Sequence, residues 1–499
     1  MLQHSRSDPR FVFVRFFPHR LVLLGCLGIL ASGHFTAVAA TTSVAVSVAS
    51  PPASLDVNDV IIEAALADTF AYTALGELCD TIGARLAGSP EMQAAIDWAV
   101  ATMQREGFDK VWTEPVTFPY WQRGREWARA TAPLELELPI LGLGNSIGTP
   151  PDGIEAEILA VTDFEELEAR ASEAAGKIVL FDPPWSGYGG SVQYRTRGAS
   201  AAAKHGAVAC LVRSVTNYSL NTPHTGMMRY EEDVPRIPVA CVTVEDAGRL
   251  HRLALSGQNP RVHLYMEAQT LPDVESFNVI GDILGSELPD EIVLAGGHLD
   301  TWDTGTGAHD DGAGCIITLA AARLLKQLGL EPRRTIRIVL FENEEAGGFG
   351  GRAYLDAHTD EVDLHVAALE SDSGAFPPRG FSIQDEEPIL ERLRAMTGSL
   401  AHLTSTDGDS LHAEAVFAGW SGVDIRPLVE LGVPGIGHRT HSDEYFHYHH
   451  GPADTFDKID PTALAQNVAA VAVLLHGLAN DPLLLRDYRS PAPDVEPTQ

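Results

Sequence analysis

The chain is poor in basic residues, in cysteine and in long apolar runs. It carries 35 Lys and Arg against 68 Asp and Glu, which gives a formal net charge of −33. Because a surface this acidic repels a phosphate backbone, we expect no nucleic-acid partner. The five cysteines are irregularly spaced and match no zinc knuckle. After residue 40 we expect no stretch to span a bilayer, and therefore no stable membrane insertion.

The first 39 residues have the pattern of an export signal. Four arginines precede an apolar run over residues 21–30, and small residues follow up to Ala37-Val38-Ala39. A basic start, an apolar middle and an A-x-A site predict a cleaved signal peptide over residues 1–39. The protein would then be secreted or periplasmic, or lysosomal or extracellular in a eukaryote. A retained membrane anchor and lipidation at Cys26 are the alternatives.

Export also leaves open the state of two cysteines in apolar, strand-like segments. An oxidising compartment permits a disulfide between Cys210 and Cys241. Two buried free thiols are the alternative.

Changes of composition along the chain predict its domain organisation. Residues 55–129 have apolar residues at helical spacing, and Ser89 before a proline predicts a helix start. Residues 130–270 are short β-like runs broken by Gly, Pro and Asp, which predicts an inserted β-rich domain. Residues 271–481 alternate strands and helices, and 482–499 form a Pro-rich, flexible tail. This alternation predicts an α/β fold whose largely parallel sheet has helices on both faces.

Three successive predicted strands are each followed by residues that can bind a metal. In chain order these residues are His298, the pair Glu344-Glu345, and Asp372. Asp310, at a Gly-rich turn before a helix, and His450, in a His-rich loop, are two further candidates. Because ligands bind at the carboxyl ends of parallel strands, we expect these side chains to converge in one crevice.

Each signal has a plain structural explanation when it is taken alone. Asp311 is placed to cap the helix that follows it, although capping does not explain why Asp310 is acidic too. The pair Glu344-Glu345 is compatible with a solvated loop, and the histidines near His450 with a surface cluster. Asp300 is placed to accept a hydrogen bond from the ring of His298 and so to fix its tautomer.

Taken together, the candidates predict a metal centre. The set is His298, Asp310, Glu345, Asp372 and His450. Two imidazoles and three carboxylates suit zinc. One ion rarely needs five such ligands, whereas two ions that share a bridging carboxylate do. We therefore expect two zinc ions, with the other glutamate of the pair as general base.

With these residues assembled, the sequence resembles the M28 family of zinc peptidases from about residue 55 to residue 481. The matching segments are 79–89, 121–124, 297–303, 310–314, 344–345, 370–374, and His450 with Asp454-Thr455. The resemblance implies a mixed, mostly parallel zinc-peptidase sheet flanked by helices. It also implies that the inserted block is a protease-associated domain.

The resemblance further implies a role for each candidate. The implied ligand set is His298 and Asp372 for one zinc, Glu345 and His450 for the other, and Asp310 as the bridge. Glu344 would be the general base, and Tyr445 is a candidate for stabilising the oxyanion. His447 and His449 crowd His450, so the choice of the last ligand stays open.

The implied activity is that of a secreted exopeptidase acting on short peptides, above all dipeptides with a free carboxyl terminus, in a chain that forms a homodimer. An aminopeptidase with the same metal core is the nearest alternative. A receptor-like protein on this scaffold loses its ligands, whereas this chain retains all of them. An M20-type peptidase carries a lid domain between its last two ligands, and the stretch from Asp372 to His450 is too short for one.

Overall fold

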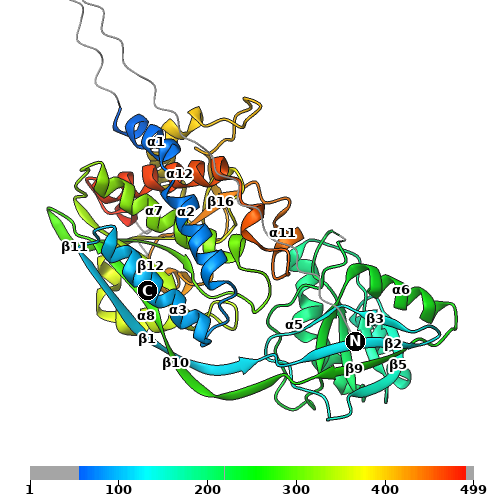
Figure 1. The fold of residues 1–499 in the computed structure, drawn as a ribbon. Helices are drawn as coiled ribbons and strands as arrows, with labels where there is room; N and C mark the ends of the chain where they lie inside the picture. The colour runs from blue at the N-terminus through cyan, green and yellow to red at the C-terminus, as the bar shows by residue number, and fades with distance from the viewer. Residues whose placement is uncertain (1–55, 219, 490–499) are drawn as a thin grey trace, which may run out of the picture. The chain divides into compact units, whose positions relative to one another are not determined.

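Two eight-stranded sheets organise the described part of the chain, which comprises residues 56–218 and 220–489 of this computed structural model (Figure 1). The predicted signal peptide and Cys26 lie outside the described residues. In order across the first sheet, the strands are β1 (Lys110–Gln122), β10 (Gln269–Ile283), β12 (Arg334–Phe341), β11 (Leu288–His298), β13 (His365–Ser371), β16 (Gly435–Thr440), β14 (Pro378–Ile383) and β15 (Val416–Ala418).

The first sheet is mixed. Its four central strands, β12, β11, β13 and β16, run parallel to one another, whereas β10 and β14 join them antiparallel on either side. Every residue of β12 is buried, because alternate side chains pack under helices on opposite faces.

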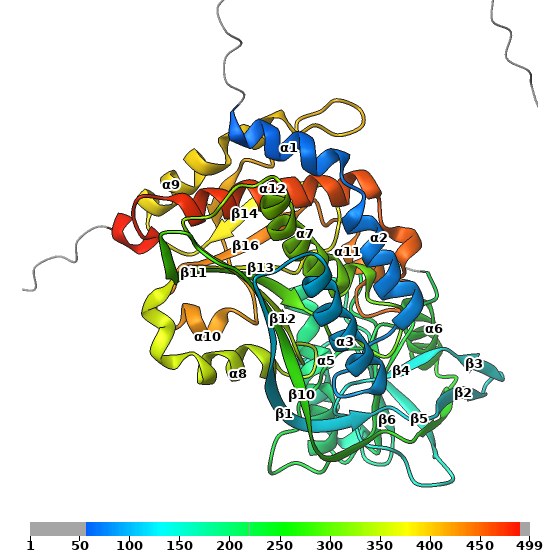
Figure 2. The same cartoon turned by 60° about the vertical axis from the view of Figure 1, so that its left-hand side comes forward.

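Helices cover both faces of this sheet (Figure 2). On one face lie α1 (Val57–Ala67), α2 (Phe70–Glu77), α3 (Pro90–Arg105), α7 (Ala313–Gln327), α9 (Glu387–Thr397) and α12 (Pro461–Asn480). On the other lie α8 (Phe349–Ala357) and α10 (Arg426–Val429). The side chain of Ser89 accepts a hydrogen bond from the N–H of Met92, which confirms the predicted start of α3.

Helix α12 differs from the expectation that no later stretch is long and apolar enough to cross a membrane. It has 20 residues and a mean hydropathy of 1.5, so it meets that criterion by length and composition. However, 78% of its apolar window is buried, and it packs against α7 and α1 in the core. Its apolar character is that of a core helix.

The second sheet lies in the predicted insertion. Its strands, in order, are β3 (Leu136–Leu138), β2 (Glu126–Ala132), β9 (Arg261–Met266), β5 (Ile154–Val161), β6 (Ile178–Phe181), β7 (Ala209–Arg213), β8 (Val239–Val242) and β4 (Ile140–Gly142). Its helices are α4 (Phe164–Ala169), α5 (Tyr188–Lys204) and α6 (Val244–Leu255). The strands from β5 to β8 are parallel, so half of this sheet is α/β in character. Because β2 pairs with β9, the sheet begins at residue 126 and not at 130.

Cys210 in β7 and Cys241 in β8 are both buried free thiols. Burial raises the pKa of Cys241 to about 12 and that of Cys210 further, so both stay protonated and unreactive. The structure therefore agrees with the alternative of two buried free thiols and contains no disulfide between Cys210 and Cys241.

The predicted flexible tail is packed in its described part, residues 482–489. Leu485 is only 1% exposed and joins the core, and the hydroxyl of Tyr488 donates to Asp481 at 2.8 Å. The proline-rich composition does not reveal that Leu485 packs in the core.

The remaining elements are the helix α11 (Tyr445–Tyr448) and the short 3₁₀ or π turns η1 (Leu78–Ile82), η2 (Ala171–Glu173), η3 (Ala308–Gly312), η4 (Thr359–Leu364), η5 (Gly398–His402), η6 (Phe456–Lys458) and η7 (Leu485–Tyr488).

A histidine after α8 ties this helix to β1. His358 is 8% exposed, and its ring nitrogens lie 2.9 Å from carboxylate oxygens of Glu114 and Glu361. Burial acts to lower the pKa of His358, but the hydrogen bonds to both carboxylates outweigh it and raise the pKa. The charged pairing is therefore complete below the ordinary histidine pKa and is lost as the pH rises through the raised one.

We expect His358→Gln to lower the free energy of unfolding by about 1–3 kcal/mol near pH 6, with the loss shrinking towards pH 9. Urea unfolding across this pH range measures it. His402→Gln is the matched control, because that side chain is 76% exposed. A loss of the same size at every pH would contradict the charge-based explanation.

Candidate metal centre

The carboxyl ends of β11, β12 and β13 meet at one edge of the first sheet. His298, the last residue of β11, is in register with Phe341 at the end of β12. Glu344 and Glu345 lie three and four residues after the end of β12, and Asp372 follows the last residue of β13. Parallel pairing thus collects the candidates of three strands, as the sequence predicts.

Asp310 lies between two groups of the predicted ligands. Its Oδ1 is 3.3 Å from Nε2 of His298, and this nitrogen is 3.8 Å from Oδ1 of Asp372. Its Oδ2 is 3.4 Å from Nε2 of His450, and this nitrogen is 2.9 Å from Oε2 of Glu345. The structure therefore brings all five residues together, with Asp310 in the middle.

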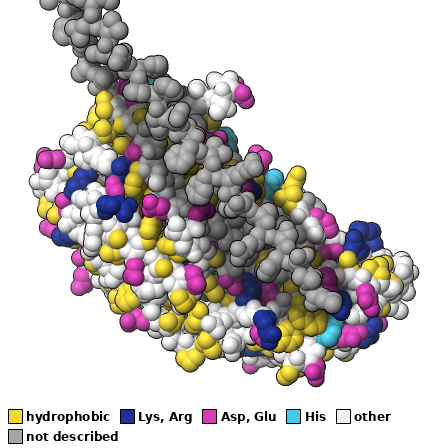
Figure 3. Space-filling model, viewed as in Figure 1, with side chains coloured by type: hydrophobic (Ala, Val, Ile, Leu, Met, Phe, Trp, Pro, Cys, Tyr) yellow, Lys and Arg dark blue, Asp and Glu magenta, His cyan; other side chains and the backbone are white. Residues whose placement is uncertain are grey.

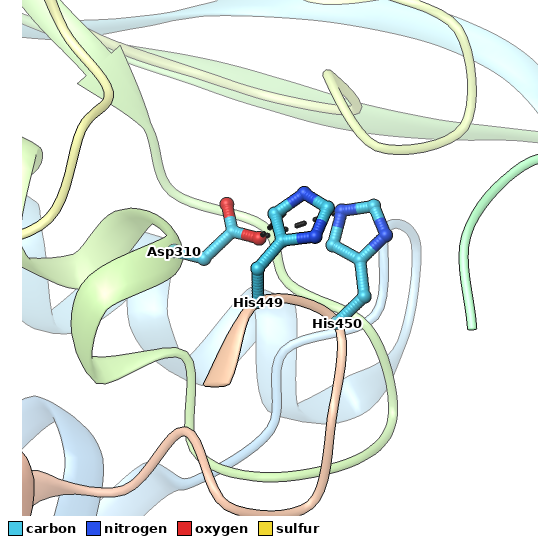
Figure 4. Close-up of side chains that lie close together, drawn as sticks. All are labelled: Asp310, His449 and His450. Atoms are coloured by element: carbon cyan, nitrogen blue, oxygen red, sulfur yellow. Dashed lines mark ion pairs between the residues drawn. The ribbon is translucent and has the colours of Figure 1, made fainter. Parts of the chain in front are cut away.

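Figure 4 shows Asp310 facing two adjacent histidines of one loop. Nε2 of His449 is 3.8 Å from Oδ2 of Asp310, and the rings of His449 and His450 stack 3.6 Å apart. His447 instead stacks on Tyr218. Of the three histidines, His450 lies nearest to the carboxylates, and His449 supports its ring.

The carboxylates of this cluster have the properties of cation ligands. Oδ2 of Asp310 is buried and has no hydrogen-bond donor within the described ranges. Burial raises the pKa of Asp310 to about 6 and that of Glu344 to about 8, and it raises the pKa of Glu345 strongly. A divalent cation would hold all three ionised. Imidazole nitrogens and carboxylate oxygens are the donors that zinc takes, so the residues fit this metal.

Asp311 lies as close to the cluster as Asp310 does. His298, Asp311 and Asp372 offer ligand atoms within 4.8 Å of one another. However, Oδ2 of Asp311 accepts the backbone N–H of His298 at 3.2 Å, and its Oδ1 accepts that of Gly314 at 3.0 Å. Asp311 therefore caps the start of α7 and positions His298, as the capping explanation predicts.

Asp300 acts differently from the expectation. Nδ1 of His298 is 2.9 Å from the backbone oxygen of Asp300 and 3.7 Å from its carboxylate. The carboxylate instead accepts the backbone N–H of Glu344 at 3.0 Å and that of Glu345 at 3.3 Å. A carbonyl thus fixes the histidine ring, and Asp300 positions the glutamate pair.

Hydrogen bonds from residues outside the strands hold the loops of the cluster in place. Asp454 accepts the backbone N–H groups of His309 at 2.8 Å and Asp310 at 3.1 Å. Arg85 is fully buried and donates to four backbone carbonyls, three of them in residues 299–307. The segments around Arg85 and Asp454 therefore serve the geometry of the site.

A cavity of about 420 Å³ opens onto the cluster. It is lined by residues around the first sheet and by residues of the insertion. From α11, the hydroxyl of Tyr445 lies 3.5 Å from Oδ1 of Asp372, and burial raises the pKa of Tyr445 strongly. From α5 of the insertion, Arg195 reaches the cavity. Its Nη1 is 3.1 Å from Nδ1 of His450, and its Nη2 donates to the hydroxyl of Tyr188 at 2.9 Å.

Arg195 is a residue that sequence reasoning missed. It is 5% exposed, its Nε has no acceptor, and it forms no ion pair with any carboxylate of the described chain. A buried cation without an anion is costly unless a ligand supplies one. No signal in the sequence separates this arginine from its neighbour Arg197.

The fold and the side-chain cluster define a metallohydrolase, and comparisons with known proteins narrow the class. The model of the family described as Peptidase family M28 matches residues 278–475. The chain is 42% identical to carboxypeptidase Q from Mus musculus and from Homo sapiens over 428 residues, which covers 85% of this chain and 89% of each relative. The chain therefore belongs to peptidase family M28, and it is a metallo-exopeptidase of zinc-peptidase type.

Solved structures show the same fold. A peptidase M28 precursor from Shewanella amazonensis has a TM-score of 0.81 at 38% identity and covers 88% of this chain and 98% of that chain. A zinc aminopeptidase from Bacillus subtilis has a TM-score of 0.62 at 20% identity and covers 82% and 94%, which shows similarity of fold alone.

The role found for Asp300 can be tested separately from catalysis. Asp300→Asn removes a charge that accepts two backbone N–H groups, and we expect zinc affinity or activity to fall about 10–100-fold while the fold is kept. Competition with a chromogenic chelator measures the affinity. Asp290→Asn, an exposed aspartate of the preceding strand β11, is the control. Unchanged affinity and activity in Asp300→Asn would refute the positioning role.

Proposed function

We propose that the chain is an exported di-zinc exopeptidase that cleaves short peptides, above all dipeptides with a free carboxyl terminus. The observation that supports two ions is the position of Asp310, whose two oxygens face different ligand groups at 3.3 and 3.4 Å. One carboxylate that serves two cations is the usual bridge of such centres. Export rests on the N-terminal sequence pattern alone.

The proposed assignment follows the two groups. His298 and Asp372 would hold one zinc, Glu345 and His450 would hold the other, and Asp310 would offer one oxygen to each group. The backbone carbonyl of Asp300 would then fix the outer nitrogen of one imidazole, in the way metal-binding histidines are usually held.

In the proposed mechanism, bound zinc supplies the Lewis acidity that activates water and polarises the scissile carbonyl. Glu344 takes the proton of the attacking water as the carbon–oxygen bond forms. It then gives this proton to the leaving nitrogen as the carbon–nitrogen bond breaks. The carboxylate of Asp300 keeps Glu344 in place by accepting a hydrogen bond from the backbone N–H of Glu344. The hydroxyl of Tyr445 donates a hydrogen bond to the developing oxyanion.

The same metal core serves carboxypeptidases and aminopeptidases, so the ends of the substrate must be distinguished by other groups in the cavity. Arg195 favours carboxypeptidase activity, because it is a buried guanidinium beside His450 that has no carboxylate partner among the residues the structure describes. We propose that it binds the terminal carboxylate of the peptide.

The inserted domain would therefore frame one side of the cleft. We assign it as a protease-associated domain on the strength of the family resemblance and of the position of Arg195 in α5. Formation of a homodimer stays a prediction of that resemblance.

The role of Glu344 makes a direct prediction. Glu344→Gln should lower kcat by at least about 10³-fold, because the amide cannot take up the proton, while both zinc ions are retained. Peptide hydrolysis and elemental analysis on the same preparation measure this. Asp310→Asn is the contrasting variant and should lose metal. Substantial turnover in Glu344→Gln would remove this residue from the base role.

Dipeptides blocked at one end distinguish the two exopeptidase types. We expect C-terminal amidation to lower kcat/KM about 10–100-fold through the lost charge-assisted hydrogen bond, and N-acetylation to have a smaller effect. Arg195→Gln should remove the penalty for amidation. Arg197→Gln, an exposed arginine of the same helix, is the control. A larger penalty for N-acetylation would identify an aminopeptidase.

A further inference from the structure

The predicted ligand His450 is held in place by a residue of the insertion. The backbone N–H of Thr225 donates to the backbone oxygen of His450 at 2.9 Å, and the backbone oxygen of Thr225 lies 3.2 Å from Nδ1 of this histidine. When Nε2 of a neutral imidazole binds a metal, Nδ1 carries the hydrogen, so the carbonyl of Thr225 is its acceptor. Nη1 of Arg195 donates to the same carbonyl at 3.2 Å. Thr225 therefore fixes both the backbone and the ring of His450.

The other predicted histidine ligand is held from within its own sheet. Nδ1 of His298 lies 2.9 Å from the backbone oxygen of Asp300, two residues further along the chain. Both imidazoles thus have a backbone carbonyl as partner, but the partner of His450 comes from a distant segment in the insertion. The two groups of predicted ligands therefore depend on different parts of the fold.

Further hydrogen bonds join the segment after β7 to the loop that precedes His450. Nδ1 of His224 donates to the backbone oxygen of His449 at 2.7 Å, and Oγ1 of Thr216 donates to that of Phe446 at 2.5 Å. His224 is 2% exposed, and burial lowers its pKa to about 4. Its ring is therefore neutral at neutral pH, with its one N–H on Nδ1, facing the carbonyl.

The backbone of His450 has a conformation that needs such support. Its φ is 59°, in the left-handed region that residues with a Cβ rarely adopt. A residue stays there only where its surroundings hold it. The backbone N–H groups nearby bond locally, that of His447 to Glu444 and that of His449 to Tyr445. The long-range hydrogen bonds to the oxygens of His449 and His450 come from the insertion.

The donors in the insertion are themselves fixed to the second sheet. Oγ1 of Thr225 donates to the backbone oxygen of Gly142 in β4 at 2.7 Å. Oγ of Ser214 accepts the backbone N–H of His224 at 2.9 Å and donates to the backbone oxygen of Val242 in β8 at 2.7 Å. The second sheet therefore sets the position of the groups that hold His450.

These hydrogen bonds are a different kind of constraint from the charges of the outer surface. On the face in Figure 3, acidic and basic side chains are dispersed among apolar and polar ones. Attraction between exposed charges is screened over about 10 Å and fixes no distance, whereas a hydrogen bond requires its donor and acceptor about 3 Å apart. The placement of a metal ligand requires the second kind of constraint.

We propose that the inserted domain is a structural part of the metal centre, in which His224 and Thr225 are positioning residues that hold His450 as a ligand. This inference rests on the two-zinc assignment of the proposed function. Binding of zinc by the group of Glu345 and His450 depends on the insertion, whereas binding by the group of His298 does not. The insertion thus acts on metal occupancy as well as on the substrate.

The test measures zinc content of the purified protein in buffers of stepped free zinc concentration. His224→Ala removes the hydrogen bond to His449. We expect it to weaken one zinc about 10–100-fold and to spare the other, so that at intermediate free zinc the content falls from two ions per chain to about one. His224→Asn should restore part of the affinity, because its amide nitrogen can take the place of Nδ1.

Cobalt(II) gives a second readout, which a general loss of stability would not reproduce. Its visible absorption depends on the geometry of its ligands, so titration of the metal-free protein with Co²⁺ follows the two groups separately. We expect His224→Ala to weaken only one of the two steps. His263→Ala is the matched control, because Nε2 of this histidine in β9 lies 2.8 Å from the backbone oxygen of Asp152, within the insertion. It should keep both steps.

Thermal unfolding establishes that each variant is folded. If His224→Ala is not, Thr216→Val decides the outcome, because it removes the hydrogen bond to Phe446 with little change of shape. Unchanged affinity for both ions in the folded variant, or equal weakening of both, would overturn the inference and leave the proposed function standing. So would a loss that His224→Asn does not restore. A wild-type protein that binds a single zinc would overturn the two-ion assignment, and this inference with it.

Discussion

The burial of several carboxylates at the ends of three parallel strands is the constraint on which the rest of the structure depends. Asp310, Glu344 and Glu345 all have raised pKa values because burial disfavours their charged forms. Side chains of one charge cannot remain ionised together in such a place without a cation. The cluster is therefore stable as a set of anions only around metal, and the family to which the chain belongs uses zinc.

This constraint explains why so much of the surrounding structure consists of backbone hydrogen bonds to acidic side chains. Asp300, Asp311 and Asp454 each accept main-chain N–H groups next to a predicted ligand. These carboxylates are satisfied without any metal, which separates them from Asp310, whose Oδ2 is not. The acidic residues of the site thus fall into two groups: those that hold the loops, and those whose oxygens are left for a cation.

The convergence of the candidate ligands could be predicted from the sequence because strand ends are local features and parallel pairing is a general rule. His298, Glu345 and Asp372 follow apolar strands, and their convergence required no knowledge of the loops. The choice among three adjacent histidines could not be made, because the turn of one short loop decides which ring faces Asp310. The carboxylate of Asp300 was assigned to the wrong partner for the same reason.

Long-range contacts were beyond sequence reasoning altogether. Arg195 comes from the insertion and meets a histidine 255 positions later, so no local pattern marks it. The described part of the tail was misjudged because one apolar side chain, Leu485, outweighs the proline-rich composition around it. The insertion boundary differs by four residues because β2 pairs with β9, a choice of partner that strand propensity does not encode.

The charges of the cavity bear on how one metal core can serve opposite exopeptidase reactions. Recognition of a free amino terminus needs a carboxylate that is not already committed, whereas recognition of a free carboxyl terminus needs a cation. In this cavity, the carboxylates belong to the metal cluster or accept backbone N–H groups, whereas Arg195 forms no ion pair with any residue that the structure describes. Because Arg195 comes from α5 and the predicted ligands come from the ends of the strands, a substrate that contacts both must lie between the inserted domain and the first sheet. In the proposed function, specificity therefore arises from the pairing of two separate parts of the fold, while the chemistry stays with the strand ends.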